Sequence, residues 1–363
     1  MSPLPRPMVA LGLVVGILAV SASAILARYA MGDDPGVITA PAGAAPALAV
    51  AFWRTALGAL ALAPFAFRNA RRRRVPLTPQ RHRQIAASGL ALGLHFALFQ
   101  GALALTTVAS AVTLATMSPL FVALGGWWFL KEPTGRRTWI GMALTMAGAI
   151  VVGVGDLTAI DLGLEALTGD VMAFGSALAV TAYLLLGRVA RRDTPTTVYA
   201  SGVYAWAAIA LLPVCLLTGT SLVGFDAPTW LAIAAIVVGP QLLGHTVFNA
   251  LLSTIPATLV SIVVLSEPVG AGLLAWLLLG ELPSALFAVG APLVLLGVAL
   301  ATARARAPVV TDEVVEPDPL TPPTPTVESS DDPAGDSDSP GSGSEDQRQP
   351  RTLLDDADDR PER

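Results

Sequence analysis

The sequence has few charged residues and almost no cysteine. Charged residues make up 13% of the 363 positions, whereas a soluble globular domain carries about 25%. Cys215 is the only cysteine, which excludes an intramolecular disulfide and any metal site built from several cysteines. Hydrophobic residues make up 53% of the chain. This composition excludes a soluble globular protein and predicts an all-α polytopic membrane protein.

Several catalytic signatures are absent as well. The chain contains no H-E-x-x-H metalloprotease motif, no G-x-S-x-G nucleophile motif and no Walker-type G-x-x-x-x-G-K-[ST] loop. An intramembrane enzyme is therefore disfavoured, and nothing in the sequence predicts a catalytic residue. We also expect no cofactor and no nucleic-acid partner.

The acidic residues are concentrated at the C-terminal end. Residues 1–307 contain 18 arginine or lysine residues and 11 acidic ones, whereas residues 308–363 contain 4 and 16. This last stretch also contains ten prolines. Such a composition cannot bury enough apolar surface to offset the entropy of ordering, so we expect residues 304–363 to form a disordered cytoplasmic tail. The tail either increases solubility or acts as a regulatory docking segment.

Ten long apolar windows occupy the rest of the chain. A helix that crosses a hydrocarbon core of about 30 Å needs about 20 apolar residues. Helices are expected because backbone polar groups in lipid must be satisfied inside the segment. The predicted spans are residues 8–29, 46–67, 84–105, 108–130, 137–155, 169–190, 197–218, 229–252, 256–280 and 284–303.

The connections between these spans differ in charge. The connections after the second, fourth and sixth spans and the end of the tenth carry arginines, with seven of them between Arg68 and Arg83. The alternate connections contain no arginine or lysine. The positive-inside rule therefore predicts a plasma-membrane (cell inner membrane) protein with both termini in the cytoplasm, residues 1–7 forming a short N-terminal tail.

The first span could instead be a cleaved signal peptide. Arg6 precedes an apolar run that ends in Ser21-Ala22-Ser23-Ala24, which resembles a cleavage site. The run is longer than a usual signal-peptide core, and cleavage would leave nine spans. A retained first helix is therefore favoured.

The chain resembles itself at a spacing of 149 residues. This spacing aligns Pro119 with Pro268, Trp127 with Trp276 and Glu132 with Glu281, together with several leucines and glycines. We therefore expect two five-helix repeats, residues 8–155 and 169–303, joined by an external connection at 156–168. Because each repeat has an odd number of spans, the second copy enters the membrane from the opposite side. Inverted repeats are typical of alternating-access carriers.

Several short motifs resemble those of a known family. Leu130-Lys131-Glu132 and Leu279-Gly280-Glu281 close the fourth and ninth spans, and Ser118-Pro119 and Glu267-Pro268 lie within them. Over residues 8–303 the chain resembles the EamA branch of the drug/metabolite transporter superfamily, in its ten-helix form. The resemblance implies a secondary carrier that exports amino acids, metabolites or toxic organic compounds without ATP.

Glu267 is the first candidate functional residue. It lies near the middle of the ninth span, where a carboxylate costs about 2.5–3.5 kcal/mol to insert. It could take up and release a proton as a cavity dries and wets, or be a structural carboxyl paired with a neighbouring helix. Pro268 lacks an N–H group, so the carbonyl of Val264 has no helical partner and a kink is expected. Ser118, the first-half counterpart of Glu267, is a further binding candidate, and Pro119 after it is likewise expected to kink its helix. Only the second half therefore carries charge at this level.

Five further polar residues lie inside apolar spans. Gln241, His245 and Asn249 recur every four residues in the eighth span, which places them on one helix face. His95 and Gln100 lie in the third span, and Gln100 is the counterpart of Asn249. These side chains either line a cavity or fasten the helices by hydrogen bonds. No metal site is expected, because neither histidine has ligand partners at a fixed local spacing.

Arg54 is a second charged residue within the spans. Its guanidinium needs a carboxylate, which Glu267 or an anionic or zwitterionic solute could supply, unless the side chain reaches the outer surface.

Glu132 and Glu281 precede the next helix, where a carboxylate suits free N–H groups, so they are expected to be structural caps. Tyr183, in the sixth span, is expected to be a packing residue.

The sequence as a whole predicts a secondary-active transporter. We expect it to export small metabolites, amino acids or drugs by alternating access, with protons as the coupling ion that Glu267 suggests. The alternatives are a facilitator without ion coupling, and a non-transporting membrane sensor that signals through the acidic tail.

Overall fold

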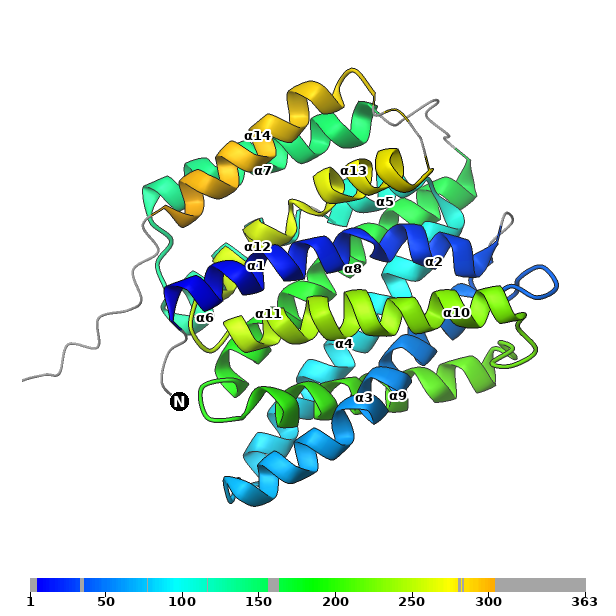
Figure 1. Cartoon of the computed structure of the whole chain (residues 1–363), viewed down its shortest axis with the longest axis horizontal. Helices are drawn as coiled ribbons and strands as arrows, with labels where there is room; N and C mark the ends of the chain where they lie inside the picture. The colour runs from blue at the N-terminus through cyan, green and yellow to red at the C-terminus, as the bar shows by residue number, and fades with distance from the viewer. Residues whose placement is uncertain are drawn as a thin grey trace, which may run out of the picture. The chain divides into compact units, whose positions relative to one another are not determined.

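The structure is a computed structural model of the chain and describes residues 5–32, 36–76, 78–115, 117–155, 163–279, 282 and 284–303. Within these ranges all regular secondary structure is helical (Figure 1). This confirms the prediction of an all-α protein. The predicted tail at 304–363, residues 156–162 of the predicted external connection at 156–168, and Glu281 lie outside the described residues. The described end of that connection is helical from Leu164 onward.

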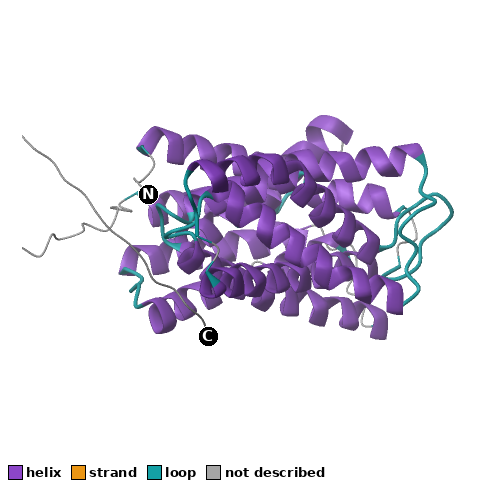
Figure 2. Ribbon diagram, turned by 90° about the horizontal axis from the view of Figure 1, so that it is seen from below, coloured by secondary structure: helices purple, strands orange, loops and turns teal. Residues whose placement is uncertain are grey.

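The described helices follow one another with short connections. They are α1 (Arg6–Ser21), α2 (Ser23–Met31), α3 (Ala47–Arg72), α4 (Pro79–Leu105), α5 (Val108–Ala115), α6 (Ser118–Leu130), α7 (Arg136–Gly155), α8 (Leu164–Ala190), α9 (Thr196–Leu217), α10 (Ala227–Ile236), the π-helix η1 (Val237–His245), α11 (Thr246–Leu251), α12 (Ala257–Val264), α13 (Glu267–Leu279) and α14 (Phe287–Thr302). Figure 2 shows the described loops gathered at the two ends of the helices, as expected for a bundle that crosses a layer.

Nine helical stretches of the described part are long and apolar enough to cross a membrane. They coincide with the first nine predicted spans; α1 and α2 form the first, α5 and α6 the fourth, α10, η1 and α11 the eighth, and α12 and α13 the ninth. The tenth predicted span contains α14, which is apolar but only 16 residues long. The protein is therefore a multi-pass membrane protein.

Several spans are interrupted near their middle. α1 and α2 are separated by Ala22, and α12 and α13 are separated by Leu265 and Ser266. Pro119 and Pro268 each lie in the first turn of a new helix, α6 and α13, where a residue without an N–H group removes no helical hydrogen bond. At both prolines, therefore, a new helix begins.

The eighth span contains a π-helical segment. η1 includes Pro240, whose missing N–H group disturbs the regular hydrogen-bond pattern of an α-helix. π-Helical turns are rare and often occur at functional sites. The segment ends at His245, one of the residues predicted to line a cavity.

Helices α7 and α14 pack with their backbones in contact. A Cβ atom added to Gly148 would lie 2.7 Å from the carbonyl oxygen of Gly290, and one added to Gly141 would lie 2.6 Å from that of Gly297. Small residues are needed here because any side chain would displace the facing backbone. Gly141 and Gly148 correspond to Gly290 and Gly297 at the 149-residue spacing, so the repeat relates these contacts to each other.

Two arginine contacts also follow the repeat. Arg28 in α2 donates from Nη1 to the carbonyl oxygen of Leu103 in α4 (2.6 Å). Arg188 in α8 donates from Nη1 to the carbonyl oxygen of Leu252, just after α11 (2.7 Å). Leu103 and Leu252 are 149 residues apart. Each arginine therefore ties the opening span of its half to the third span of that half.

Helix α8 is fastened at both ends by polar contacts. Near its start, Asp170 accepts hydrogen bonds from the hydroxyl groups of Thr106 (3.0 Å) and Ser110 (2.6 Å). Near its end, Arg188 forms an ion pair with Glu132 (Nε to Oε1, 3.0 Å). Thr106 and Ser110 come soon after the end of α4, where Arg28 contacts Leu103. The start of α8 therefore lies at the same end of the bundle as Arg28, and Arg188, near the end of α8, lies at the opposite end.

Two loops meet at the end of the bundle where α10 begins. The N–H group of Asp226 donates to the carbonyl oxygen of Gly43 (2.9 Å). The carboxylate of Asp226 accepts from the N–H group of Thr229 (2.8 Å), which caps α10. Hydrogen bonding by the side chain and by the N–H group of Thr229 lowers the pKa of Asp226. The loop before α3 is thereby joined to the loop before α10.

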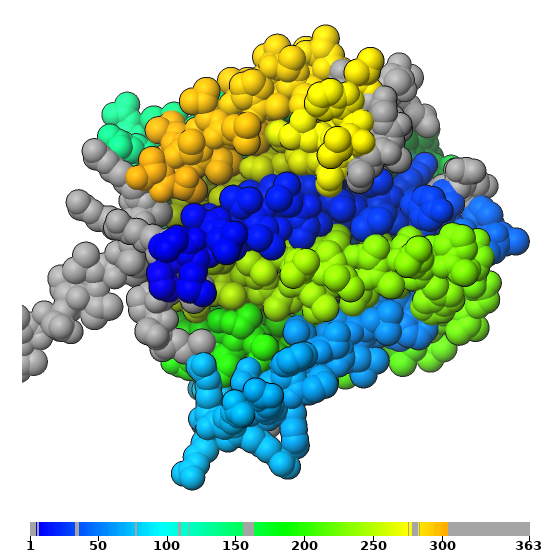
Figure 3. Space-filling view, in the orientation of Figure 1, coloured from blue at the N-terminus to red at the C-terminus, as the bar shows by residue number. Residues whose placement is uncertain are grey.

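The outer surface of the helices is apolar. Leu11 and Leu18 of α1 are 64% and 59% exposed, and Leu295 and Leu296 of α14 are 55% and 61% exposed. Figure 3 shows α1 and α14 on the same face of the molecule. Such a face is unfavourable in water but not against lipid tails, which are as apolar as leucine. The lipid bilayer is therefore a partner of the protein.

Candidate functional site

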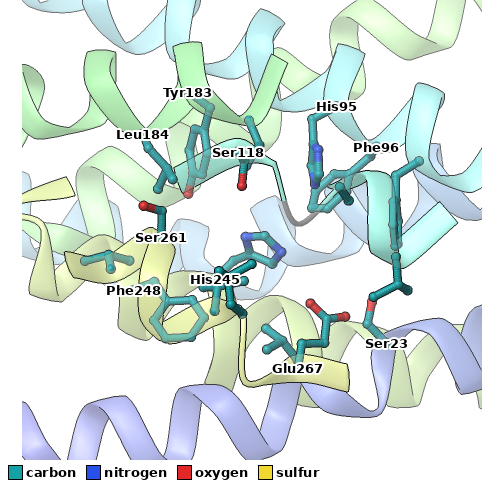
Figure 4. A pocket seen from close by; sticks show the side chains of 18 of the residues that line it. Ser23, His95, Phe96, Ser118, Tyr183, Leu184, His245, Phe248, Ser261 and Glu267 are labelled. Atoms are coloured by element: carbon teal, nitrogen blue, oxygen red, sulfur yellow. The ribbon is translucent and has the colours of Figure 1, made fainter. Parts of the chain in front are cut away.

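A cavity of about 100 Å³ lies between helices of the two halves of the chain. Its walls come from α1 to α6 in the first half and from α8, η1, α11, α12 and α13 in the second. Figure 4 shows the polar groups of Ser23, His95, Ser118, His245 and Glu267 arranged around it. Both halves of the chain thus line the cavity.

The interrupted spans meet at this cavity. Ser23 begins α2, Ser118 begins α6 and Glu267 begins α13, and all three side chains line the cavity. The first residues of a helix carry N–H groups without a helical partner and a partial positive charge. Irregular backbone at membrane depth is tolerated where it lines a cavity, and discontinuous helices are typical of transporter binding sites.

Arg54 of α3 is buried in the wall of the cavity, only 1% exposed. Its Nε donates to Oε1 of Gln241 (3.0 Å), and its Nη1 makes a long contact with Oγ of Ser23 (3.5 Å). Its guanidinium carbon lies 3.8 Å from the centre of the Phe96 ring. Nη2 has no hydrogen-bond partner among the described residues. The guanidinium is therefore held firmly in position but incompletely paired.

Glu267 is the first residue of α13, and Figure 4 shows its carboxyl group directed into the cavity. The ion pairs of the described residues all involve Glu132, so no basic nitrogen lies within 4.0 Å of the Glu267 carboxylate. Arg54 lines the same cavity. The two charged residues thus line one cavity without direct contact.

Two histidines and a group of aromatic rings complete the walls. Nδ1 of His95 lies 2.8 Å from Oγ of Ser176, and its ring stacks on Phe99. The ring of His245 meets Phe96 edge to face, with 5.1 Å between the ring centres. Among the described residues, no group of three or more His, Cys, Asp or Glu side chains could hold a metal ion.

The structure separates the eight candidate binding residues into two groups. Five of them line the cavity: Arg54, His95, Ser118, His245 and Glu267. The other three are fully buried behind it: Gln100, Gln241 and Asn249.

The three buried amides differ in their contacts. Gln241 accepts a hydrogen bond from Arg54, and Asn249 accepts one from the hydroxyl group of Tyr183. Both amides thus bond to side chains that line the cavity. Neither polar side-chain atom of Gln100 has a hydrogen-bond partner among the described residues.

Tyr183 is a site residue that sequence reasoning missed. It lines the cavity and bonds to Asn249. The signal that could have found it is its position five residues before Arg188, which matches that of Ser23 before Arg28. Since both Ser23 and Tyr183 line the cavity, the opening spans of the two halves contribute equivalent positions.

The helices, the cavity and the interrupted spans define a polytopic membrane protein with a small cavity between two sets of helices. A model of the EamA-like transporter family matches residues 7–154 and 167–303. The chain therefore belongs to the EamA-like transporter family, and it is a membrane transporter of small molecules.

Two individual proteins are similar to the chain. An uncharacterized transporter of Archaeoglobus fulgidus is 28% identical over 224 residues, which cover 61% of this chain and 75% of the relative. A protein of known crystal structure superposes with a TM-score of 0.65 over 83% of this chain and 99% of its own, at 22% identity. The second similarity concerns the fold alone.

Proposed function

We propose that the protein is a secondary-active carrier that exports small metabolites, amino acids or drugs across the plasma membrane. The observation that supports this most strongly is the cavity that lies where the interrupted spans of both halves meet and that is lined by Arg54 and Glu267. We propose no catalytic step, because the polar side chains described in the walls of the cavity are suited to binding a solute and form no recognised catalytic arrangement.

The relation between the halves supports alternating access as the mechanism. The contacts of Arg28 and Arg188 are equivalent within the repeat and lie at opposite ends of the bundle. Two five-helix halves of opposite orientation can rock about one central site, so that each end of the bundle opens in turn. With both termini in the cytoplasm, the Arg188 end faces the cytoplasm and the Arg28 end faces outward.

Proton coupling is assigned to Glu267. Among the described residues that line the cavity, it is the only acid, and Arg54, His95, His245 and Tyr183 are the other titratable groups around it. When the cavity opens to water the carboxylate is solvated, and when the cavity closes the neutral form is favoured. A proton bound on one side of the membrane can therefore be released on the other.

The test is transport by purified protein in liposomes, with amino acids, nucleosides and cationic dyes as solutes. We expect flux that increases with an imposed proton gradient in the native protein, and flux that no longer responds to the gradient in Glu267→Gln. The matched control is Glu165→Gln, which changes an exposed acid in the first turn of α8. Native flux that ignores the gradient would identify an uncoupled facilitator, and absence of flux for every solute would contradict the transport proposal.

A further inference from the structure

We infer that the solute carries a carboxylate group and that Arg54 binds it. The inference rests on the proposed function and specifies the class of solute. Its basis is the unequal use of the donors of Arg54: Nε is paired with Gln241, Nη1 has only the 3.5 Å contact with Ser23, and Nη2 has none among the described residues.

A buried guanidinium is costly unless an anion pairs with it. Arg54 is 99% shielded from solvent, yet no carboxylate of the described residues lies within 4.0 Å of it. Glu267, in the same cavity, remains separate from it. The partner that the protein does not supply at Arg54 is supplied by the solute.

The position of the guanidinium suits a carboxylate in particular. The two Nη atoms form one edge of the planar group and can donate two parallel hydrogen bonds to the two oxygens of a carboxylate. Gln241 holds the opposite part of the group, and the ring of Phe96 supports its face. The first turns of α6 and α13 begin at the same cavity, at Ser118 and Glu267, and their partial positive charges also favour an anion.

The rest of the cavity selects a small apolar body. Phe99, Tyr183, Phe248 and Val264 provide apolar surface around the polar groups. The space open to the centre of a water molecule is about 100 Å³, and about 10–15 Å³ of such space holds one water molecule, so the cavity has room for several non-hydrogen atoms. The site therefore fits a short, branched or compact carboxylic acid.

A carboxylate on Arg54 adds a negative charge beside Glu267, and this charge can be balanced in two ways. Either Glu267 takes up a proton when a simple carboxylate binds, or an ammonium group on the same solute lies against the ionised Glu267. In both cases the carboxylate binds Arg54. The two cases are distinguished with compounds of one carbon skeleton that lack either the ammonium group or the carboxylate.

The experiment is thermal unfolding of the full chain in detergent with four matched compounds at millimolar concentration. These are valine, 3-methylbutanoate (no ammonium), isobutylamine (no carboxylate) and 3-methylbutanamide (neither charge). Because a ligand that binds only the folded state raises the melting temperature, we expect an increase with 3-methylbutanoate and none with isobutylamine or the amide. If valine also raises the melting temperature, Glu267→Gln tests whether its ammonium group pairs with Glu267. In that case the variant should reduce the increase with valine but not the increase with 3-methylbutanoate.

Arg54→Gln is expected to lose the increase, and Arg54→Lys, which keeps the charge without the paired donors, to reduce it. The control is Arg28→Gln, which removes another arginine that bonds a carbonyl away from the cavity and should keep the full increase. The inference would be overturned if isobutylamine or the amide stabilised the protein as much as the carboxylates do. It would also be overturned if neither carboxylate stabilised the protein. Flux of non-carboxylate solutes in liposomes would in that case leave the transport proposal standing.

Discussion

The ion pair between Glu132 and Arg188 should control access to the cavity from the side that we predict to be cytoplasmic. Glu132 follows α6 in the first half and Arg188 ends α8 in the second, with 3.0 Å between Oε1 and Nε. In the alternating-access mechanism that we propose, the halves separate at this end when the cavity opens there. Glu132→Gln should therefore favour the state that is open to the cytoplasm.

The size of this effect follows from the exposure of the pair. The side chains of Arg188 and Glu132 are 9% and 26% exposed, so solvent screens the pair only in part. A hydrogen bond to a charged group contributes about 1.5–3 kcal/mol, and the low end of that range applies to a pair that is partly exposed. Because about 1.4 kcal/mol corresponds to a factor of ten in an equilibrium constant, the open population should increase about tenfold.

Cysteine labelling can measure this population directly. Cys215 is the only cysteine and is buried in the structure, so Cys215→Ser gives a background for single cysteines. Ser261→Cys places a thiol on the wall of the cavity. A membrane-impermeant thiol reagent added from the cytoplasmic side should label it about ten times faster when Glu132→Gln is also present, while the open state remains the minor one.

The matched control is Arg192→Gln. Arg192 also approaches Glu132, but its Nη2 atom is 4.0 Å from Oε1 and its side chain is 56% exposed, so its loss should change labelling little. Unchanged labelling in Glu132→Gln, or an equal effect of Arg192→Gln, would refute the role of the Glu132–Arg188 pair in closing the cavity.

Two further predictions concern packing and the wall of the cavity. Gly148→Ala would place its Cβ atom 2.6 Å from the backbone nitrogen of Val294, so we expect a loss of about 1–3 kcal/mol, seen as a lower melting temperature. Gly239→Ala, which meets nothing within 4 Å, is its control, and equal melting temperatures would contradict the predicted contact. Tyr183→Phe removes the hydrogen bond to the buried Asn249, which should destabilise by about 1–3 kcal/mol and weaken solute binding; unchanged unfolding and flux would reject it.

The spans could be predicted from the sequence because the thickness of a membrane fixes the length of an apolar helix. Their ends were less predictable, because polar residues can extend a helix beyond the lipid. The third span was predicted at 84–105, but α4 begins at Pro79, where the hydroxyl group of Thr78 caps the helix by accepting from the N–H group of Arg81. A hydropathy pattern does not report such a cap.

The helix interruptions were predicted only in part. Pro119 and Pro268 indicated irregular backbone, since proline removes a donor wherever it occurs. The interruption at Ala22 lies between Ser21 and Ser23, and no proline or glycine marks it. Pro240, in contrast, could have indicated the irregular segment η1 in the eighth span.

The candidate site could be predicted by residue type but not by contact. The cost of a charge in lipid identified Arg54 and Glu267 as unusual, and both line the cavity. The acceptor for Arg54 is Gln241, 187 residues further along the chain, and no local pattern relates the two. The ion pair of Glu132 with Arg188 is a contact of the same kind, since the sequence suggested only a helix cap at Glu132.

The central claim is that the two halves cross the membrane in opposite directions. Pro133 and Leu282 are both exposed and lie 149 residues apart, directly after Glu132 and Glu281. Pro133→Cys and Leu282→Cys, each in the Cys215→Ser background, should be labelled by an impermeant reagent from the cytoplasmic side and from the outer side, respectively. Labelling of both positions from the same side would contradict the account.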